Sequence, residues 1–93
     1  MKFLFNLTEQ TLKITRGEYF LVLSEPFYTL GGIVFTLDYS EPPACWIAFS
    51  VRKESVRVIY KNSGTSYQRE IARPASGIIE VEFSERDKLK NHD

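Results

Sequence analysis

The sequence predicts an all-β fold, a single small antiparallel β-sandwich or half-closed β-barrel of about eight strands with meander connectivity. The first supporting observation is that apolar and polar residues alternate with period two through most of the chain. The second is that short segments rich in Gly, Pro, Asn, Ser or paired charges interrupt this alternation. Alternation is typical of half-buried strands, and short connections favour antiparallel neighbours.

The strongest strand pair lies in the middle of the chain. Its inward-facing residues alternate with more polar neighbours, and these inward residues are Cys45, Ile47, Phe49, Val51, Val56, Val58 and Tyr60. With Lys53–Glu54 as the loop, Val51 faces Val56 and every inward pair from there is apolar. A slip of one residue would set Val51 against Arg57, so the pattern itself determines the register of this hairpin.

The N-terminal third predicts a three-stranded meander. We expect Glu9–Gln10 to form the first turn and so to place Leu7 opposite Leu12. Gly17–Glu18 is the clearest turn signal, because glycine at the first loop position suits a type II′ hairpin. The third strand, Tyr19–Ser24, is apolar on both sides, and we expect it to be central or covered on both faces.

The segment Glu25–Gly32 breaks the alternation and predicts the crossing between two halves of the fold. Its proline and its Gly-Gly pair permit a sharp change of direction, and its apolar residues argue against a free linker. The glycine pair lacks the Lys-Ser/Thr that follows in a phosphate-binding loop. The next strand, 33–39, alternates again, and the loop Ser40–Ala44 then places Leu37 opposite Ile47.

The C-terminal half predicts two further strands and a short tail. A turn at Asn62–Thr65 pairs Arg57 with Glu70, which leaves Arg69 on the inner face unless its strand lies at an edge. The last strand presents three apolar residues inward, and these are Ile79, Val81 and Phe83. Ser84 and the acidic residues after it are typical of a helix N-cap. We therefore divide the chain into a β domain, 1–84, and a polar tail or short helix, 85–93.

Length and composition indicate one globular domain. The chain has 93 residues, 43% of them hydrophobic, and its 12 basic and 12 acidic residues cancel. No segment approaches the ~20 apolar residues of a membrane helix. The start, Met1–Leu7, has no small-residue cleavage site after it, so we expect a strand and not a secretory signal. The one cysteine, Cys45, is predicted to be a small buried hydrophobe, and its lack of a disulfide partner predicts a cytoplasmic protein.

Side-chain catalysis or metal binding requires a cluster of His, Cys or carboxylate groups. The single histidine, His92, is next to the C-terminus, and we expect it to be a solvated tail residue. Glu80 and Glu82 lie two apart on one strand face, where we expect solvent exposure or ion pairs with nearby Lys and Arg. We therefore predict a protein that is not an enzyme and has no cofactor and no metal.

The leading functional prediction is a protein–protein interaction module that forms a homodimer or binds a protein partner. Trp46, Ala48 and Ile59 are expected together on the outward face of the central hairpin, and Ile78 is a further outward apolar residue. A small β-protein with apolar residues on two faces commonly covers one of them by association. These four residues are the candidate interface.

The first alternative is a nucleic-acid-binding module. Residues 52–73 hold six basic and two acidic residues, which gives a net charge of +4. Trp46, Arg52, Arg57 and Lys61 are the candidate contacts, because an aromatic ring among cations can stack bases and contact phosphates.

The second alternative is a small-ligand-binding β-barrel. Six aromatic residues are predicted to face inward and to line such a pocket, namely Phe5, Phe35, Tyr39, Phe49, Tyr60 and Tyr67. Packing in a core is the commoner fate of such residues. No motif in the sequence is specific enough to indicate a family.

Overall fold

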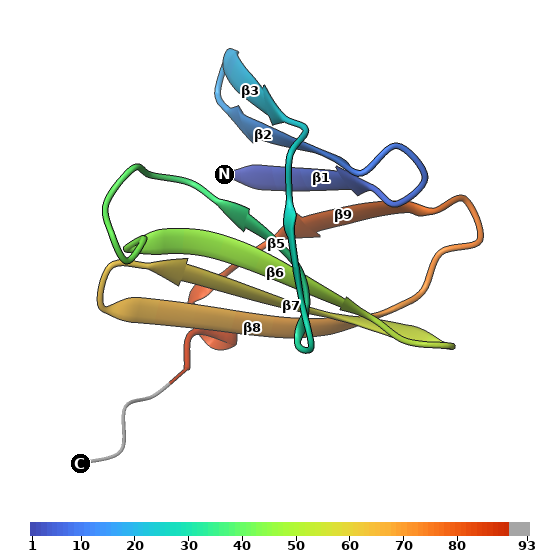
Figure 1. The fold of residues 1–93 in the computed structure, drawn as a ribbon. Helices are drawn as coiled ribbons and strands as arrows, with labels where there is room; N and C mark the ends of the chain where they lie inside the picture. The colour runs from blue at the N-terminus through green and yellow to red at the C-terminus, as the bar shows by residue number, and fades with distance from the viewer. Residues whose placement is uncertain (90–93) are drawn as a thin grey trace.

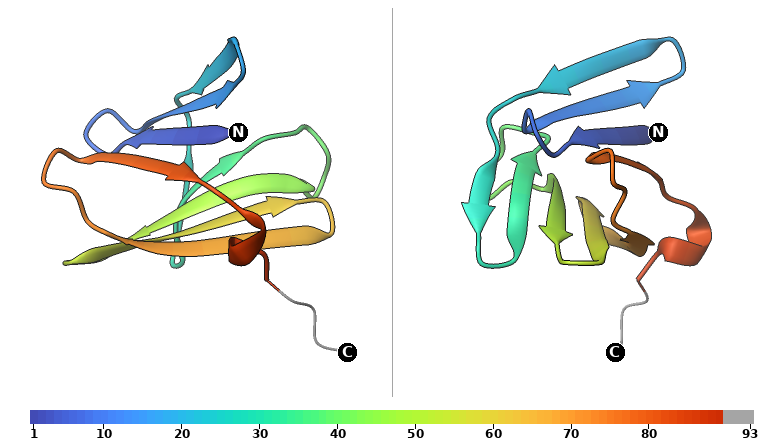
Figure 2. Two further views of the ribbon diagram at one scale, coloured as in Figure 1. Left: turned by 180° about the vertical axis from the view of Figure 1, so that it is seen from behind. Right: turned by 90° about the vertical axis from the view of Figure 1, so that its right-hand side faces the viewer.

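The computed structural model describes residues 1–89 and shows two antiparallel sheets packed face to face (Figures 1 and 2). The first sheet has the order β3-β2-β1-β9, with β1 Lys2–Asn6, β2 Thr11–Arg16, β3 Tyr19–Leu23 and β9 Ile78–Glu82. The second sheet has the order β4-β5-β6-β7-β8, with β4 Phe27–Thr29, β5 Gly32–Thr36, β6 Cys45–Val51, β7 Ser55–Asn62 and β8 Thr65–Ala72. A 3-10 helix, η1 (Glu85–Asp87), follows the last strand.

The predicted β-sandwich is confirmed, and the meander holds within each sheet. The one departure is β9, which pairs with β1 of the first sheet and not with its predecessor β8. The first and last strands therefore lie side by side, β1 inside the sheet and β9 at its edge (Figure 1). The chain crosses between the sheets twice, after β3 and after β8.

The first crossing occurs where the sequence predicted it. Only Ser24–Pro26 separates β3 of the first sheet from β4 of the second. The predicted crossing also contains a short strand, because Phe27 pairs with Val34 of β5 before the chain turns at Leu30 and Gly31. Proline cannot donate a ladder hydrogen bond, which explains why this pairing stops at Phe27.

The central hairpin β6–β7 has the predicted register. Val51 lies opposite Val56, and the amide of Arg52 donates to the carbonyl of Ser55 over 2.8 Å at the turn. The next hairpin, β7–β8, also has its predicted register. Arg69 does share a face with core residues, and it reaches the edge of the sheet, where its Nη1 donates to the carbonyl of Glu82 over 3.1 Å.

Two predicted registers are wrong, each by two residues. Leu12 lies opposite Phe5 and not Leu7, because the first loop is longer than predicted and closes with a hydrogen bond from the Gln10 amide to the Asn6 carbonyl. Gln10 takes the left-handed conformation there, with φ of 59°. An error of two residues keeps each side chain on its predicted face, so the alternation alone cannot detect it.

The second error concerns the pairing of β5 with β6. Ile47 lies opposite Phe35 and not Leu37, because β5 ends at Thr36 and a long loop follows. Tyr39 was predicted on the inner face of this strand; it lies in the loop and is fully exposed. The loop is held by the carboxylate of Asp38, as described below.

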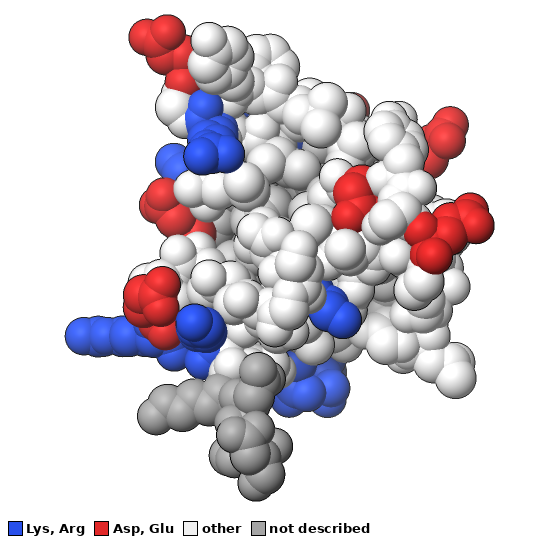
Figure 3. Space-filling view, turned by 90° about the vertical axis from the view of Figure 1, so that its left-hand side faces the viewer, with Lys and Arg blue, Asp and Glu red and all other residues white. Residues whose placement is uncertain are grey.

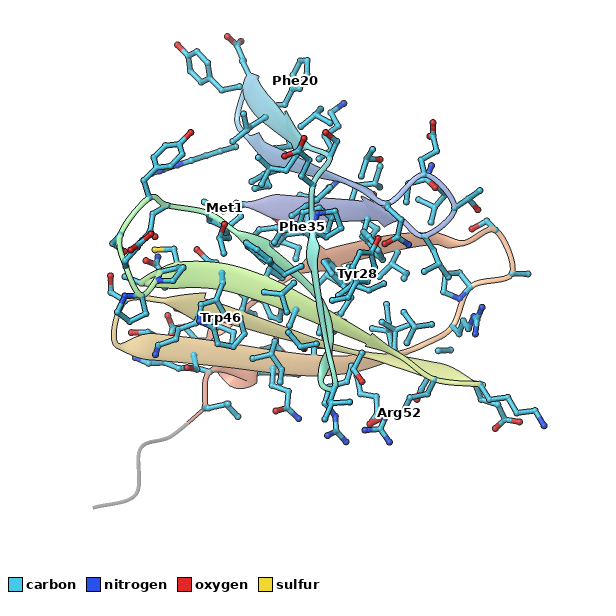
Figure 4. All side chains as sticks on the ribbon, in the orientation of Figure 1. Met1, Phe20, Tyr28, Phe35, Trp46 and Arg52 are labelled. Atoms are coloured by element: carbon cyan, nitrogen blue, oxygen red, sulfur yellow. The ribbon has the colours of Figure 1, made fainter. Side chains whose placement is uncertain are left out.

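The core lies between the sheets and is rich in aromatic rings. Phe5 of β1 stacks on Phe49 of β6 with ring centroids 4.4 Å apart, and Phe35 packs edge-on against Phe5 at 5.7 Å. All three rings are 0–1% exposed, and Phe35 lies between the two sheets in Figure 4. Ile79 and Val81 complete this core from β9, as predicted. Aromatic contacts of this geometry therefore join the sheets directly.

One glycine permits the close approach of β5 to β6. Gly32 has φ of 133°, and a Cβ atom at this position would collide with the backbone carbonyl of Phe49. Only glycine combines that backbone conformation with the space available. Within residues 1–89, none of the helical structure is long and apolar enough to cross a membrane.

Candidate functional site

Most of the exposed large apolar residues in residues 1–89 lie on or directly after the edge strands β3 and β4, which are consecutive in the sequence. We call this surface the open edge, and it consists of Tyr19, Phe20, Leu21, Val22, Phe27, Tyr28 and Leu30. Each of these residues is at least 50% exposed. Figure 4 shows Phe20 at the top of the molecule, far from Phe35 in the core.

β3 is an edge strand with exposed side chains on both faces, which contradicts the expectation that it is central or covered. It pairs only with β2, and the β2–β3 hairpin projects beyond the second sheet (Figures 1 and 2). Leu21 faces the same side as the buried Leu12 but is 56% exposed. The sequence pattern indicated that both faces of β3 are covered, but within residues 1–89 only Leu23 is partly buried against the core.

The other edge strands carry features that discourage pairing with further strands. β8 contains Arg69 and Glu70, β9 contains Glu80 and Glu82, and β4 is only three residues long. Charges and short length are common protective features of sheet edges. β3 has neither proline nor a charged residue along its five residues. In the space-filling view of one face, uncharged side chains form a broad area and most charges lie toward its margins (Figure 3).

A second feature is a groove of about 740 Å³ on the outer face of the second sheet. Val34 and Trp46 lie on its floor strands, Phe27 borders it from β4, and Pro42 and Pro43 border it from the loop after β5. Its lining is mainly apolar. Grooves of this size and composition are typical of small-molecule sites.

The wall of the groove is held in place by the carboxylate of Asp38. Its Oδ2 accepts hydrogen bonds from the amides of Ala44 and Cys45, each over 3.1 Å, and its Oδ1 accepts from the Ser40 hydroxyl over 2.9 Å. Desolvation acts to raise the pKa of the Asp38 carboxyl, but the hydrogen bonds that it accepts outweigh this effect and hold the pKa below its ordinary value.

The predicted interface residues do not form one exposed patch. Ala48 and Ile59 lie opposite each other on the outer face of the second sheet, and Trp46 is on the same strand face. Ala48 is only 9% exposed, whereas Trp46 and Ile59 are half-buried. Ile78 belongs to β9 of the other sheet. The structure thus brings three of these residues together and separates the fourth.

The candidate nucleic-acid contacts are spread along the same sheet. Lys61 lies directly opposite Trp46, and Arg57 lies opposite Ser50 toward the other end of β6. Arg52 follows the end of β6, far from Trp46 in Figure 4. The Nε atom of Arg57 is buried without a hydrogen-bond partner. Only Trp46 and Lys61 therefore form an aromatic–basic pair.

Five of the six aromatic residues predicted to line an interior pocket pack in the core, whereas Tyr39 lies in an exposed loop. Phe5, Phe35 and Phe49 form the core stack, and Tyr60 stacks on Tyr67 with centroids 5.8 Å apart. Burial raises the pKa of the Tyr60 hydroxyl. These side chains fill the space between the sheets, so any small-ligand site belongs to the outer groove.

The remaining candidate groups have local structural partners. Cys45 was predicted to be buried, but it is only half-buried. Its Sγ donates a hydrogen bond to the Asn62 side chain over 3.3 Å. Glu80 lies 3.9 Å from the Lys2 ammonium group, which is the predicted ion pairing. His92 lies outside the described residues. Among residues 1–89, no three His, Cys, Asp or Glu side chains gather in a way that suits a metal ion.

Comparison with protein-family models, curated proteins and solved structures gives no match for this chain. The candidate sites therefore depend on the geometry alone. Sequence reasoning missed the contribution of Phe27 and Tyr28, which it placed in a connecting segment. The available signal was Pro26, because a strand that follows a proline is typically short or at an edge.

Proposed function

We propose that this protein is a non-enzymatic protein-interaction module that self-associates through the open edge. The supporting observation is the exposure of its seven apolar side chains on or directly after two consecutive edge strands, each at least 50% exposed. Exposed apolar surface gathered in this way commonly marks a site of association.

The proposed function is the one predicted from the sequence, but the proposed interface lies on a different surface of the protein. The predicted patch around Trp46 and Ile59 is half-buried within its own sheet, whereas the open edge is exposed. The single cysteine fits a reducing compartment, so we place this function in the cytoplasm.

The test is solution mass by light scattering, for the wild type and two lysine variants at equal micromolar concentration. We expect a wild-type mass of about twice the 10.8 kDa chain, and a shift toward monomer for Leu21→Lys, because burying an unpaired charge in an apolar contact is costly. Ile78→Lys is the matched control, since Ile78 is an exposed aliphatic strand residue outside the open edge. A monomeric wild type would refute self-association, and loss of the dimer only in Ile78→Lys would move the interface from the open edge to β9.

The groove beside Trp46 supports a second candidate function, the binding of a small apolar ligand. Trp46 is the single tryptophan, so its fluorescence reports occupancy directly. We expect Nile red, a neutral apolar dye, to quench Trp46 emission in a saturable way and to bind less tightly to Phe27→Ala. Tyr19→Ala, which lies outside the groove, is the control. Non-saturable quenching, or equal affinity in all three proteins, would remove this candidate.

A further inference from the structure

We infer that two copies of the chain pair along β3, antiparallel and about a two-fold axis at Leu21, so that their first sheets become one continuous sheet. This inference rests on the proposed self-association and specifies the partner, the strand and the register. The partner is a second copy because an edge strand that is apolar, uncharged and free along one side offers the same surface to its own copy.

The free peptide groups of β3 follow from the geometry of its hairpin. Arg16 and Tyr19 flank the two-residue loop, in which Gly17 has φ of 60°, as a type II′ turn requires. The residues that flank such a loop form a hydrogen-bonded pair. Because hydrogen-bonded and non-hydrogen-bonded positions alternate along an antiparallel ladder, the peptide groups of Phe20 and Val22 point toward the free edge.

These two residues determine the register. An antiparallel copy centred on Leu21 places Phe20 opposite the partner's Val22, so both residues exchange hydrogen bonds with the copy. It also overlaps all five residues of β3, because Tyr19 then faces the partner's Leu23. Registers centred on Phe20 or Val22 pair only one of these two residues within β3 and leave part of the strand unpaired. The Leu21 register therefore pairs the most backbone and covers the most apolar surface.

The side chains fit this arrangement on both faces of the joined sheet. Phe20 and Val22 lie on one face, where the Lys13 ammonium group sits 4.7 Å from the centre of the Phe20 ring. Tyr19 and Leu21 lie on the other face. Pairing brings each exposed side chain beside an apolar side chain of the copy, and cross-strand pairs of this kind stabilise sheets.

Single cysteines in β3 test the register directly. In the Leu21 register, the two Leu21 Cα atoms form a non-hydrogen-bonded pair about 4.5 Å apart, which a disulfide can bridge. The two Val22 positions, like the two Phe20 positions, are diagonal neighbours about 7–8 Å apart, beyond that reach. We expect Leu21→Cys, in a Cys45→Ser background, to form disulfide-linked dimer at least about tenfold faster than Phe20→Cys or Val22→Cys.

The possible results separate this inference from the proposed function. Faster cross-linking of Phe20→Cys or Val22→Cys would overturn the register. A dimeric mass without cross-linking at any of the three positions would overturn β3 pairing and leave self-association intact. A monomeric mass for the wild type would overturn both. Circular dichroism of each variant before oxidation confirms that the cysteines are compared in folded protein.

Discussion

At the scale of single residues, Asp38 shows how one carboxylate shapes a candidate site. It accepts hydrogen bonds from two backbone amides and one hydroxyl, and so holds the loop that forms one wall of the outer groove. Each of these bonds is to a charged acceptor, which makes it stronger than a neutral one. The same bonds lower the pKa of the carboxyl, so the folded state prefers the ionised form.

This preference predicts a pH-dependent contribution to stability. A carboxyl whose pKa is lower in the folded state stabilises the fold above its unfolded pKa, near 3.8 for Asp, and loses this effect as the pH falls through the folded pKa. We expect Asp38→Asn to lower the urea midpoint at pH 7, and the difference from wild type to shrink below pH ~3.8. Glu85→Gln, on the 3-10 helix, is the control. A difference that is equal at both pH values would show that the charge of Asp38 is not involved.

At the scale of elements, the sequence predicts which face of a sheet a side chain occupies better than it predicts the length of the loops between strands. The β6–β7 register was predictable because a one-residue slip would set Val51 against Arg57. The β7–β8 register was predictable from its turn at Asn62–Thr65, although it sets Arg69 opposite Val58. The β1–β2 and β5–β6 registers were not, because an even slip changes no face. Their loops close through Gln10 in a left-handed conformation and through the side-chain bonds of Asp38, neither of which periodicity reports.

The open edge was predictable only in part, for a related reason. The apolar residues on both sides of Tyr19–Leu23 were visible in the sequence and indicated cover on both faces. Which strands supply that cover depends on the order of strands in the sheet, and β9 takes the place beside β1 that a simple meander leaves open. β3 consequently remains at an edge. The proposed pairing of two copies gives these side chains apolar neighbours in the same sheet.

At the scale of the whole molecule, the two sheets are joined by few covalent connections and by one aromatic core. The chain passes between the sheets at Ser24–Pro26 and again between β8 and β9. Apart from these two connections, the sheets are joined by contacts in the core, and the stack of Phe5 on Phe49 is the closest aromatic contact between them. Because each sheet alone would expose its apolar inner face, we expect the sheets to unfold together in one transition.

Truncation of the core stack tests this cooperation. Phe49 is 0% exposed, so Phe49→Ala removes a buried ring and leaves a cavity, which typically costs about 3–5 kcal/mol in the free energy of unfolding. Natural domains have only about 5–15 kcal/mol in total, so the urea midpoint should fall steeply. Tyr39→Ala removes a ring of similar size from an exposed loop and should change the free energy of unfolding by about 0.5 kcal/mol or less.

The double variant Phe5→Ala/Phe49→Ala measures whether the two rings act as one unit. Since their centroids are 4.4 Å apart, we expect the two single losses to be non-additive by at least about 0.5 kcal/mol. All variants are compared by urea denaturation at one protein concentration, because self-association would add a concentration-dependent term. Strict additivity, or two separate transitions followed by fluorescence and circular dichroism, would show that the sheets are stabilised independently and that the Phe5–Phe49 stack does not join them.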